Sequence, residues 1–231
     1  MRLTARTWGT GPAVAVLVHG YTDDSTTWWR IGPELADRGY LVIAPDLRGH
    51  GTSARASSYA VEDFAADLVE VLPSRPDLAV GHSLGALALS TALDRLQPRA
   101  VVLVDPPWMQ QAGELPTGPA SSEDEVRAAA PRWSREDVRV DVASTARMDP
   151  AVTAALTSEL RRGPLAAPVA VGEAHVVVPA AESLLPPASV EALPSLGYRV
   201  HVVPGAGHVV HRDAPDAFLD VLDVAMTGVP A

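Results

Sequence analysis

Residues 78–85 read Leu78-Ala79-Val80-Gly81-His82-Ser83-Leu84-Gly85 and lead into an apolar segment that ends at Leu96. The apolar residues before Gly81 are typical of a buried β-strand, and those after Ser83 predict a helix. A strand that turns sharply into a helix strains the backbone of Ser83, and the flanking glycines avoid steric clashes. The pattern predicts a Ser83 hydroxyl exposed above the sheet, with the Leu84 amide directed at a reacting carbonyl. The simpler alternative is a tight turn that contains a passive serine.

Strand-like and helix-like segments alternate along the rest of the chain. Short apolar runs bounded by Gly or Pro lie at Ala13–Val18, Tyr40–Ala44, Leu78–Val80, Ala100–Val104, Pro168–Val171 and Tyr198–Val203. Continuous apolar runs are typical of strands buried on both faces of a parallel sheet. Helical spacing is found at Glu62–Leu72, Leu84–Leu96 and Pro215–Met226. The alternation predicts an α/β fold with an open, mostly parallel central sheet and helices on both faces.

The segment 106–164 interrupts this alternation, because it contains helical candidates but no strand-like run. Ser121 or Ser122 followed by Glu125 indicates a capping box, and Ala151–Arg162 follows Pro150 with helical spacing. We expect residues 1–105 and 165–231 to form the core and 106–164 to form a small helical cap over the edge of the sheet where ligands bind. The alternative is a peripheral helical excursion.

Composition excludes several kinds of chemistry. The 231 residues include no Cys and no Lys, so thiol nucleophiles, disulfides, zinc–thiolate sites, Schiff-base lysines and the lysine of a phosphate-binding loop are absent. A net charge of −10 argues against nucleic acid and anionic lipid as partners. Residues 1–10 lack the apolar stretch of a signal peptide, and no run is long enough to span a bilayer. We therefore expect a cytoplasmic protein without membrane contact, whose partner is a small-molecule substrate.

Four motifs occur in the order used by one known family: Val18–Thr22 with Ser25 and Trp28, Pro45–Ser53, Gly81–Gly85, and Val203–His208 with Arg212–Pro215. On these motifs the chain resembles the α/β-hydrolase family over nearly its whole length. The resemblance implies the α/β-hydrolase fold, Ser83 as nucleophile and His208 as general base. It also implies an oxyanion hole formed by the amides of Tyr21 and Leu84, and no metal or organic cofactor. Trp28 and Trp108 are candidate walls of the substrate pocket, although either could be plain core.

The remaining histidines receive no catalytic role at this stage. His19 is interpreted as a structural residue that orders the oxyanion loop through its ring. His50 and His82 are likewise interpreted as structural, whereas His201 and His211 are left without a role.

The acid that would orient His208 is not fixed by the sequence. The family usually places an Asp in the loop after the penultimate strand, but in Gly172–Pro179 that position is occupied by His175. An imidazole cannot replace a carboxylate that holds the tautomer of the base. Asp105, at the end of the run 100–104, is the preferred substitute, because some family members carry the acid one strand earlier. Glu173, Glu182 and the absence of any acid remain open.

Together these residues predict a serine hydrolase that cleaves a small ester-like substrate through a Ser83–His208–Asp105 triad and an acyl-enzyme. A serine at the elbow counts against dehalogenase and epoxide-hydrolase chemistry, because those relatives use an Asp there. The alternatives are a lactonase, a thioesterase, a carbon–carbon bond hydrolase, a cofactor-free haloperoxidase-like enzyme, or a non-catalytic binding protein with this fold.

Overall fold

The computed structural model describes residues 1–108, 122–162 and 165–227. Seven strands form one sheet in the order β1-β3-β2-β4-β5-β6-β7. Only β1 runs antiparallel, against β3. The strands are β1 (Ala5–Trp8), β2 (Ala13–Val18), β3 (Tyr40–Pro45), β4 (Leu78–His82), β5 (Ala100–Val104), β6 (Glu173–Pro179) and β7 (Arg199–Val203). The predicted mostly parallel sheet is confirmed.

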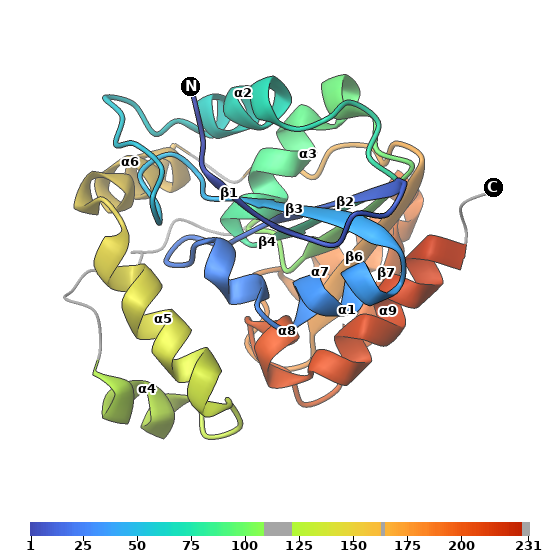
Figure 1. Ribbon diagram of the computed structural model, residues 1–231. Helices are drawn as coiled ribbons and strands as arrows, with labels where there is room; N and C mark the ends of the chain where they lie inside the picture. Colours follow the sequence, from blue (N-terminus) through green and yellow to red (C-terminus); the bar gives the residue numbers. More distant parts are fainter. Residues whose placement is uncertain (109–121, 163–164, 228–231) are drawn as a thin grey trace.

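Helices cover both faces of this sheet (Figure 1). One face carries α2 (Val61–Val71) and α3 (Leu84–Leu96), which pack on each other, and α3 also contacts β2, β4 and β5. The opposite face carries α1 (Ile31–Asp37), α8 (Val210–Asp213) and α9 (Pro215–Thr227). The buried apolar side chains accordingly form two clusters, one under each helical layer.

The strand predicted at Pro168–Val171 is wrong, because the structure places β6 at Glu173–Pro179. The predicted run is not buried: Val169 is 69% exposed. Two of the first three residues of β6, Glu173 and His175, are polar, and their side chains have partners. Glu173 accepts from Arg199 at 2.8 Å and contacts His175 at 3.1 Å. The segment 172–179, which the sequence suggested was a loop, is therefore mostly strand. The loop follows it, at residues 180–186.

Among the described residues between β5 and β6 are three helices: α4 (Glu123–Ala129), α5 (Arg135–Arg147) and α6 (Pro150–Arg161). They stand together beside one end of the sheet (Figure 1). The predicted capping box is present at Ser122, whose side chain accepts from the amide of Glu125 at 3.3 Å. The alternative cap residue Ser121 lies outside the described residues, as do the rest of 109–121 and residues 163–164.

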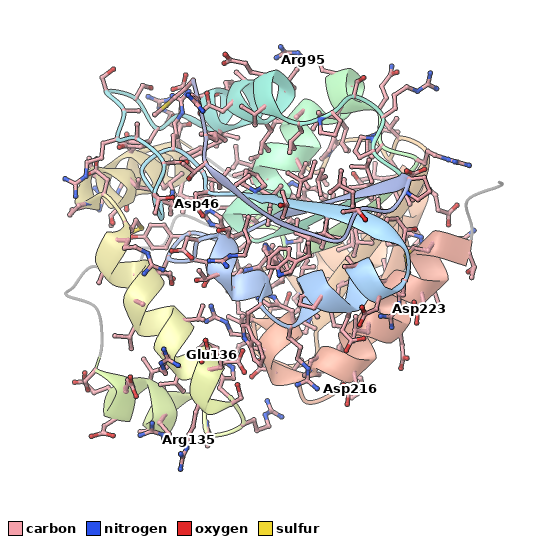
Figure 2. All side chains as sticks on the ribbon, in the orientation of Figure 1. Asp46, Arg95, Arg135, Glu136, Asp216 and Asp223 are labelled. Atoms are coloured by element: carbon pink, nitrogen blue, oxygen red, sulfur yellow. The ribbon has the colours of Figure 1, made fainter. Side chains whose placement is uncertain are left out.

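The remaining elements are short: η1 (Ser25–Trp28), α7 (Pro187–Ala192) and η2 (Leu193–Leu196). The labelled Arg95, Asp216 and Asp223 lie on the outer surfaces of their helices (Figure 2). Asp223 on α9 pairs with Arg38 at 3.1 Å.

The register of the central strands determines what meets at the carboxyl edge of the sheet. Val104 at the end of β5 is paired with His82 of β4 on one side and with Val177 of β6 on the other. The residues that follow β4 and β5 are Ser83 and Asp105. Parallel neighbours therefore bring these two side chains to the same edge, which is where ligands bind in open α/β sheets.

Candidate active site

The turn between β4 and α3 holds Ser83 in a strained conformation, with φ 50° and ψ −114°. Its amide donates to the Val104 carbonyl at 2.9 Å, which ties the turn to β5. Glycine is required on both sides: a Cβ at Gly81 would lie 2.7 Å from the amide nitrogen of Ala86, and one at Gly85 would lie 2.4 Å from the Val18 carbonyl. A non-glycine residue with positive φ at such a turn is typical of a functional site.

His208 follows β7, and its ring contacts the carboxylate of Asp105, with Nδ1 donating to Oδ2 at 2.7 Å. A carboxylate oxygen only accepts here, so the proton of the neutral ring lies on Nδ1 and the lone pair lies on Nε2. Asp105 is fully buried, whereas the side chain of His208 is 31% exposed and lines a cavity together with Ser83. The sheet thus brings Ser83, Asp105 and His208 to the same edge although they are far apart in the sequence.

Neither of the other two candidate acids, both within the described residues, is hydrogen-bonded to His208, although Glu182 lines a cavity together with His208. Glu173 is paired in register with Ala100 at the beginning of β5, so it lies at the amino end of its strand and away from the site. His175 has its ring nitrogens directed at Glu173 and at His201, whose ring stacks on it with a centroid separation of 5.0 Å. Glu182 lies in the loop after β6 and is exposed, with φ 57°.

That same loop supports Asp105 instead of supplying the acid. The Ser183 hydroxyl donates to Asp105 Oδ1 at 2.7 Å, and the Leu184 amide lies 3.1 Å from both carboxylate oxygens. Ser183 is itself oriented, because its hydroxyl oxygen accepts from the Leu185 amide at 3.1 Å. Sequence reasoning missed these two residues, since Ser183 and Leu184 belong to no recognisable motif.

His82 links the serine turn to the loop that carries His208. Its Nε2 donates to the His208 carbonyl at 3.0 Å, and the two rings lie 4.7 Å apart. Burial, followed by the nearby His208 ring, holds the pKa of His82 well below its usual value. His82 is therefore neutral at neutral pH and places the backbone of His208, in agreement with the structural role expected from the sequence.

Tyr21 and Leu84, whose amides are the predicted oxyanion donors, line the same cavity as Ser83. Leu84 is the first residue of α3, so its amide has no acceptor within the helix. The loop that carries Tyr21 is fixed by two histidine rings. His19 donates from Nδ1 to the Gly20 carbonyl at 2.8 Å and accepts the Leu47 amide at Nε2, at 2.9 Å. His50 Nε2 lies 2.7 Å from the Tyr21 carbonyl.

Asp46, labelled in Figure 2, braces the same region from the end of β3. It accepts the amides of Ser25 and Thr52, both at 2.8 Å. Burial alone would raise the pKa of Asp46, but these amide hydrogen bonds outweigh it and lower the pKa.

The cavity beside Ser83 has a volume of about 400 Å³. Its wall is formed by the oxyanion loop, the elbow, helices α2, α3, α5, α6 and α8, the loops after β5, β6 and β7, and the segment between α6 and β6. The residues that line it are Tyr21, Thr22, Asp23, Val61, His82, Ser83, Leu84, Leu87, Pro107, Asp141, Leu156, Glu159, Leu160, Leu165, Leu184, His208, Val209 and Arg212. Tyr21 reaches α6, where its hydroxyl lies 2.5 Å from that of Thr153.

Neither predicted aromatic wall is found there. Trp28 is fully buried in the core and packs 4.5 Å from the His211 ring, and Trp108 is fully buried 5.5 Å from the Tyr198 ring. Both are core residues, so their assignment to the substrate pocket was wrong. An aromatic residue near a motif carries no signal for the side of the backbone on which its ring packs.

Within residues 1–108, 122–162 and 165–227, no group of His, Asp and Glu side chains could hold a metal ion. None of the helices in that same part of the chain is both long and apolar enough to cross a membrane.

Comparison with known proteins agrees with this architecture. Among solved structures, an esterase from Exiguobacterium antarcticum superposes with a TM-score of 0.78 at 17% identity, over 97% of this chain and 95% of that one. An E-2-(acetamidomethylene)succinate hydrolase superposes with a TM-score of 0.77 at 24% identity, with coverages of 97% and 95%. At these identities the likeness concerns the fold.

Curated relatives match over shorter stretches. An uncharacterized protein of Mycobacterium tuberculosis is 46% identical over 88 residues, which are 36% of this chain and only 25% of that protein. Epoxide hydrolase A of the same organism is 35% identical over 115 residues, 46% of this chain and 36% of the relative. A pimeloyl-[acyl-carrier protein] methyl ester esterase of Methylococcus capsulatus is 40% identical over 101 residues, 44% of this chain and 38% of the relative.

The sequence model described as the alpha/beta hydrolase family matches residues 15–221. This match includes all the strands except β1 and the first two residues of β2, together with the serine turn and the histidine loop. The chain therefore belongs to the alpha/beta hydrolase family.

Proposed function

We propose that this hydrolase cleaves an ester bond in a small, largely apolar substrate, with Ser83 as nucleophile, His208 as base and Asp105 as the orienting acid. The observation that carries the proposal is the 2.7 Å hydrogen bond from His208 Nδ1 to Asp105. That bond leaves the lone pair of Nε2 available in a cavity that Ser83 shares.

The chemistry follows from this tautomer. Ser83 Oγ attacks the carbonyl carbon of the ester while its proton passes to His208 Nε2, and Asp105 stabilises the resulting imidazolium. The amides of Tyr21 and Leu84 stabilise the oxyanion. The imidazolium then gives its proton to the departing alcohol, and the acyl group remains on Ser83. A water molecule, deprotonated by His208, attacks the acyl carbon and releases the acid and free Ser83.

The relatives include both ester hydrolases and epoxide hydrolases, and the residue at the elbow favours the first. Epoxide hydrolases of this family carry an Asp as nucleophile, whereas position 83 is Ser. A hydroxyl gives an acyl-enzyme with an ester and has no carboxylate with which to open an epoxide by that route. The methyl ester esterase is therefore the better guide to reaction class.

The same proposal assigns α5 and α6 to a cap. α6 supplies Leu156 and Leu160 to the wall of the cavity, and α5 supplies Asp141. Most of the cavity wall is apolar, which suits an acyl chain or alcohol of short to medium length.

A fluorophosphonate probe tests the proposal directly. We expect one covalent adduct by intact-protein mass spectrometry, no adduct on Ser83→Ala, and an undiminished adduct on Ser90→Ala. Ser90 is a matched control, because it is a buried serine on the same helix and its hydroxyl donates to the Leu87 carbonyl at 2.8 Å. Nitrophenyl esters of short to medium chain length then measure turnover. An unlabelled, folded wild-type protein would move the chain to the class of binding proteins with this fold.

A further inference from the structure

The cavity beside Ser83 has two chemically different ends. The end toward α2, α3 and α6 is lined by Val61, Leu87, Leu156 and Leu160. The end toward α5 and α8 is lined by charged groups that the proposed reaction does not use: Asp23, Asp141 and Arg212. In Figure 1, α2 and α3 lie on one side of the sheet and α8 lies on the other, whereas α5 and α6 stand beside its end.

Arg212 is the centre of the polar end, and its charge is already matched. Its Nη1 donates to Asp141 at 2.7 Å, and its Nη2 donates to Asp23 and, at 2.9 Å, to the Thr27 hydroxyl. The Trp133 ring covers one side of the guanidinium at 4.7 Å. The residue is only 3% exposed, which makes it a fixed part of the wall and not a mobile arm.

The carboxylates outnumber this cation. Asp23 and Asp141 share the single cation Arg212, and the buried His82 is neutral. The third carboxylate of the cavity wall, Glu159, is paired with Arg162 at 2.8 Å. Asp141 keeps 23% of its side chain accessible, compared with 5% for Asp23. Burial raises the pKa of Asp141, although Arg212 partly opposes this effect. One oxygen of the Asp141 carboxyl group accepts from Arg212, and part of the side chain is accessible from the cavity. The carboxyl group can therefore accept a hydrogen bond from a second donor.

Two further buried atoms lack partners at this end. Within the described part of the chain, Arg212 Nε and His82 Nδ1 are buried and make no hydrogen bond. Buried polar atoms are rarely left in this condition, because an unmade hydrogen bond costs free energy. Both residues line the cavity, so a polar group bound there could serve them.

We infer that Asp141, Asp23 and Arg212 form a second subsite, which takes a hydroxyl or ammonium group of the substrate remote from the scissile ester and rejects a carboxylate. A donor group satisfies the accessible oxygen of Asp141, and an ammonium also offsets the excess negative charge. A carboxylate could accept only from Arg212 Nε, because the terminal nitrogens of the guanidinium are already occupied. It would also lie beside the negative charges of Asp23 and Asp141, so we expect it to be rejected. This inference rests on the proposed function, because it assumes that the ester occupies the cavity beside Ser83.

Binding to the Ser83→Ala variant tests the subsite without requiring catalysis. Hexanoate esters of four alcohols of similar length serve as ligands, with a methyl, hydroxyl, dimethylammonium or carboxylate terminus, and calorimetry measures each Kd. A second set carries the same termini on the acyl side. We expect the hydroxyl and ammonium termini to bind about tenfold more tightly than methyl in one of the two sets, as for a hydrogen bond to a charged group. The carboxylate terminus should bind more weakly than methyl.

Two variants in the same Ser83→Ala background locate the effect. In Asp141→Asn the amide oxygen stays on Arg212 Nη1 and the NH₂ group faces the ligand. A hydroxyl can still accept from this NH₂ group, so the preference for hydroxyl should remain, whereas an ammonium cannot accept and its preference over methyl should fall severalfold. Glu159→Gln is the matched control: it removes a negative charge from the same cavity, at a side chain paired with Arg162 at 2.8 Å, and should leave the preference almost unchanged. Equal changes in both variants would mean a diffuse field and would overturn the subsite.

The ligand series remains decisive if Asp141→Asn does not fold, because it needs no change in the subsite. A carboxylate terminus that binds as well as methyl would refute the inference. Hydrolysis by the wild-type protein without any discrimination among termini would also refute it while leaving the proposed function intact. The expected binding pattern without wild-type hydrolysis would refute the proposed function and leave the subsite standing.

Discussion

Replacing Asp105 by Asn tests whether the acid of this hydrolase lies after β5. The carboxylate accepts three donors: the His208 ring at Oδ2, the Ser183 hydroxyl at Oδ1 and the Leu184 amide between them. An amide has one oxygen and one NH₂ group, so it cannot accept from all three. One of the three contacts must change.

The structure indicates which contact changes. Ser183 Oγ already accepts the Leu185 amide, which sets its hydroxyl to donate toward position 105. The oxygen of the introduced amide is therefore held at the Ser183 side, where it accepts from two donors, and its nitrogen faces His208. His208 Nδ1 must then accept, the ring proton moves to Nε2, and the base can no longer take a proton from Ser83. The wrong tautomer corresponds to a loss of about 10⁴-fold in kcat, or about 5 kcal/mol of transition-state stabilisation.

Kinetics with a nitrophenyl ester measures the loss, and two variants test its cause. Glu173→Gln should retain turnover close to that of the wild type, because Glu173 lies at the amino end of β6. Adding Ser183→Ala to Asp105→Asn removes the donor that fixes the amide. The amide can then turn its oxygen to His208, and turnover should recover by about tenfold even though a second residue has been lost.

A kcat within about tenfold of the wild type for Asp105→Asn would refute the assignment of the acid. A strict further decrease in the double variant would refute the argument from the orientation of the amide. Thermal unfolding of each variant provides the control for folding.

Two other predictions concern the free energy of unfolding, one for a variant of the serine turn and one for its dependence on pH below neutrality. Gly85→Ala would place a Cβ 2.4 Å from the Val18 carbonyl, so we expect a loss of several kcal/mol in urea unfolding, and an unchanged midpoint would contradict the tight approach. Burial lowers the pKa of His50 to about 4, and lowers those of His82 and His211 in the same direction. The unfolded chain then binds more protons below pH 6.5, so stability should be full above that pH and should fall as the pH drops toward 4, by about 3 kcal/mol for His50 alone. Unfolding midpoints that do not change between about pH 7 and about pH 4.5 would contradict the burial of these rings.

The sequence predicted the parts of the fold whose burial is uniform. β2, β5 and α3 have the predicted bounds. Strands at the centre of a parallel sheet, and the helix that covers them, are mostly buried, so their sequences keep a clear apolar pattern. β1 was missed, since it is an exposed antiparallel edge strand of only four residues. β6 was misplaced because its first residues are polar and pair with one another, which no periodicity signals.

The candidate site was predictable to the extent that its residues are marked by motifs. The Gly-x-Ser-x-Gly pattern identified Ser83, and the Gly-rich stretch after β7 identified His208. The choice among Asp105, Glu173 and Glu182 could not be made from sequence. It depends on which strand ends beside β4. It also depends on the positive backbone φ of 42° at Asp105, which cannot be predicted from the sequence because the residue is not glycine.

The position of the acid also explains why His175 can stand where the family pattern suggests an Asp. The pattern was matched to residues that form the strand β6 itself, so His175 lies within the sheet and not in a loop at its carboxyl edge. In the proposed arrangement Asp105 supplies the carboxylate from β5. The loop after β6 then provides the Ser183 and Leu184 donors that hold this carboxylate. The proposed site thus needs one carboxylate and the donors that hold it. The carboxylate follows β5, and the donors follow the neighbouring strand β6. A sequence motif records only one strand from which the acid can come, whereas strand order and register determine every position from which a carboxylate can reach the histidine.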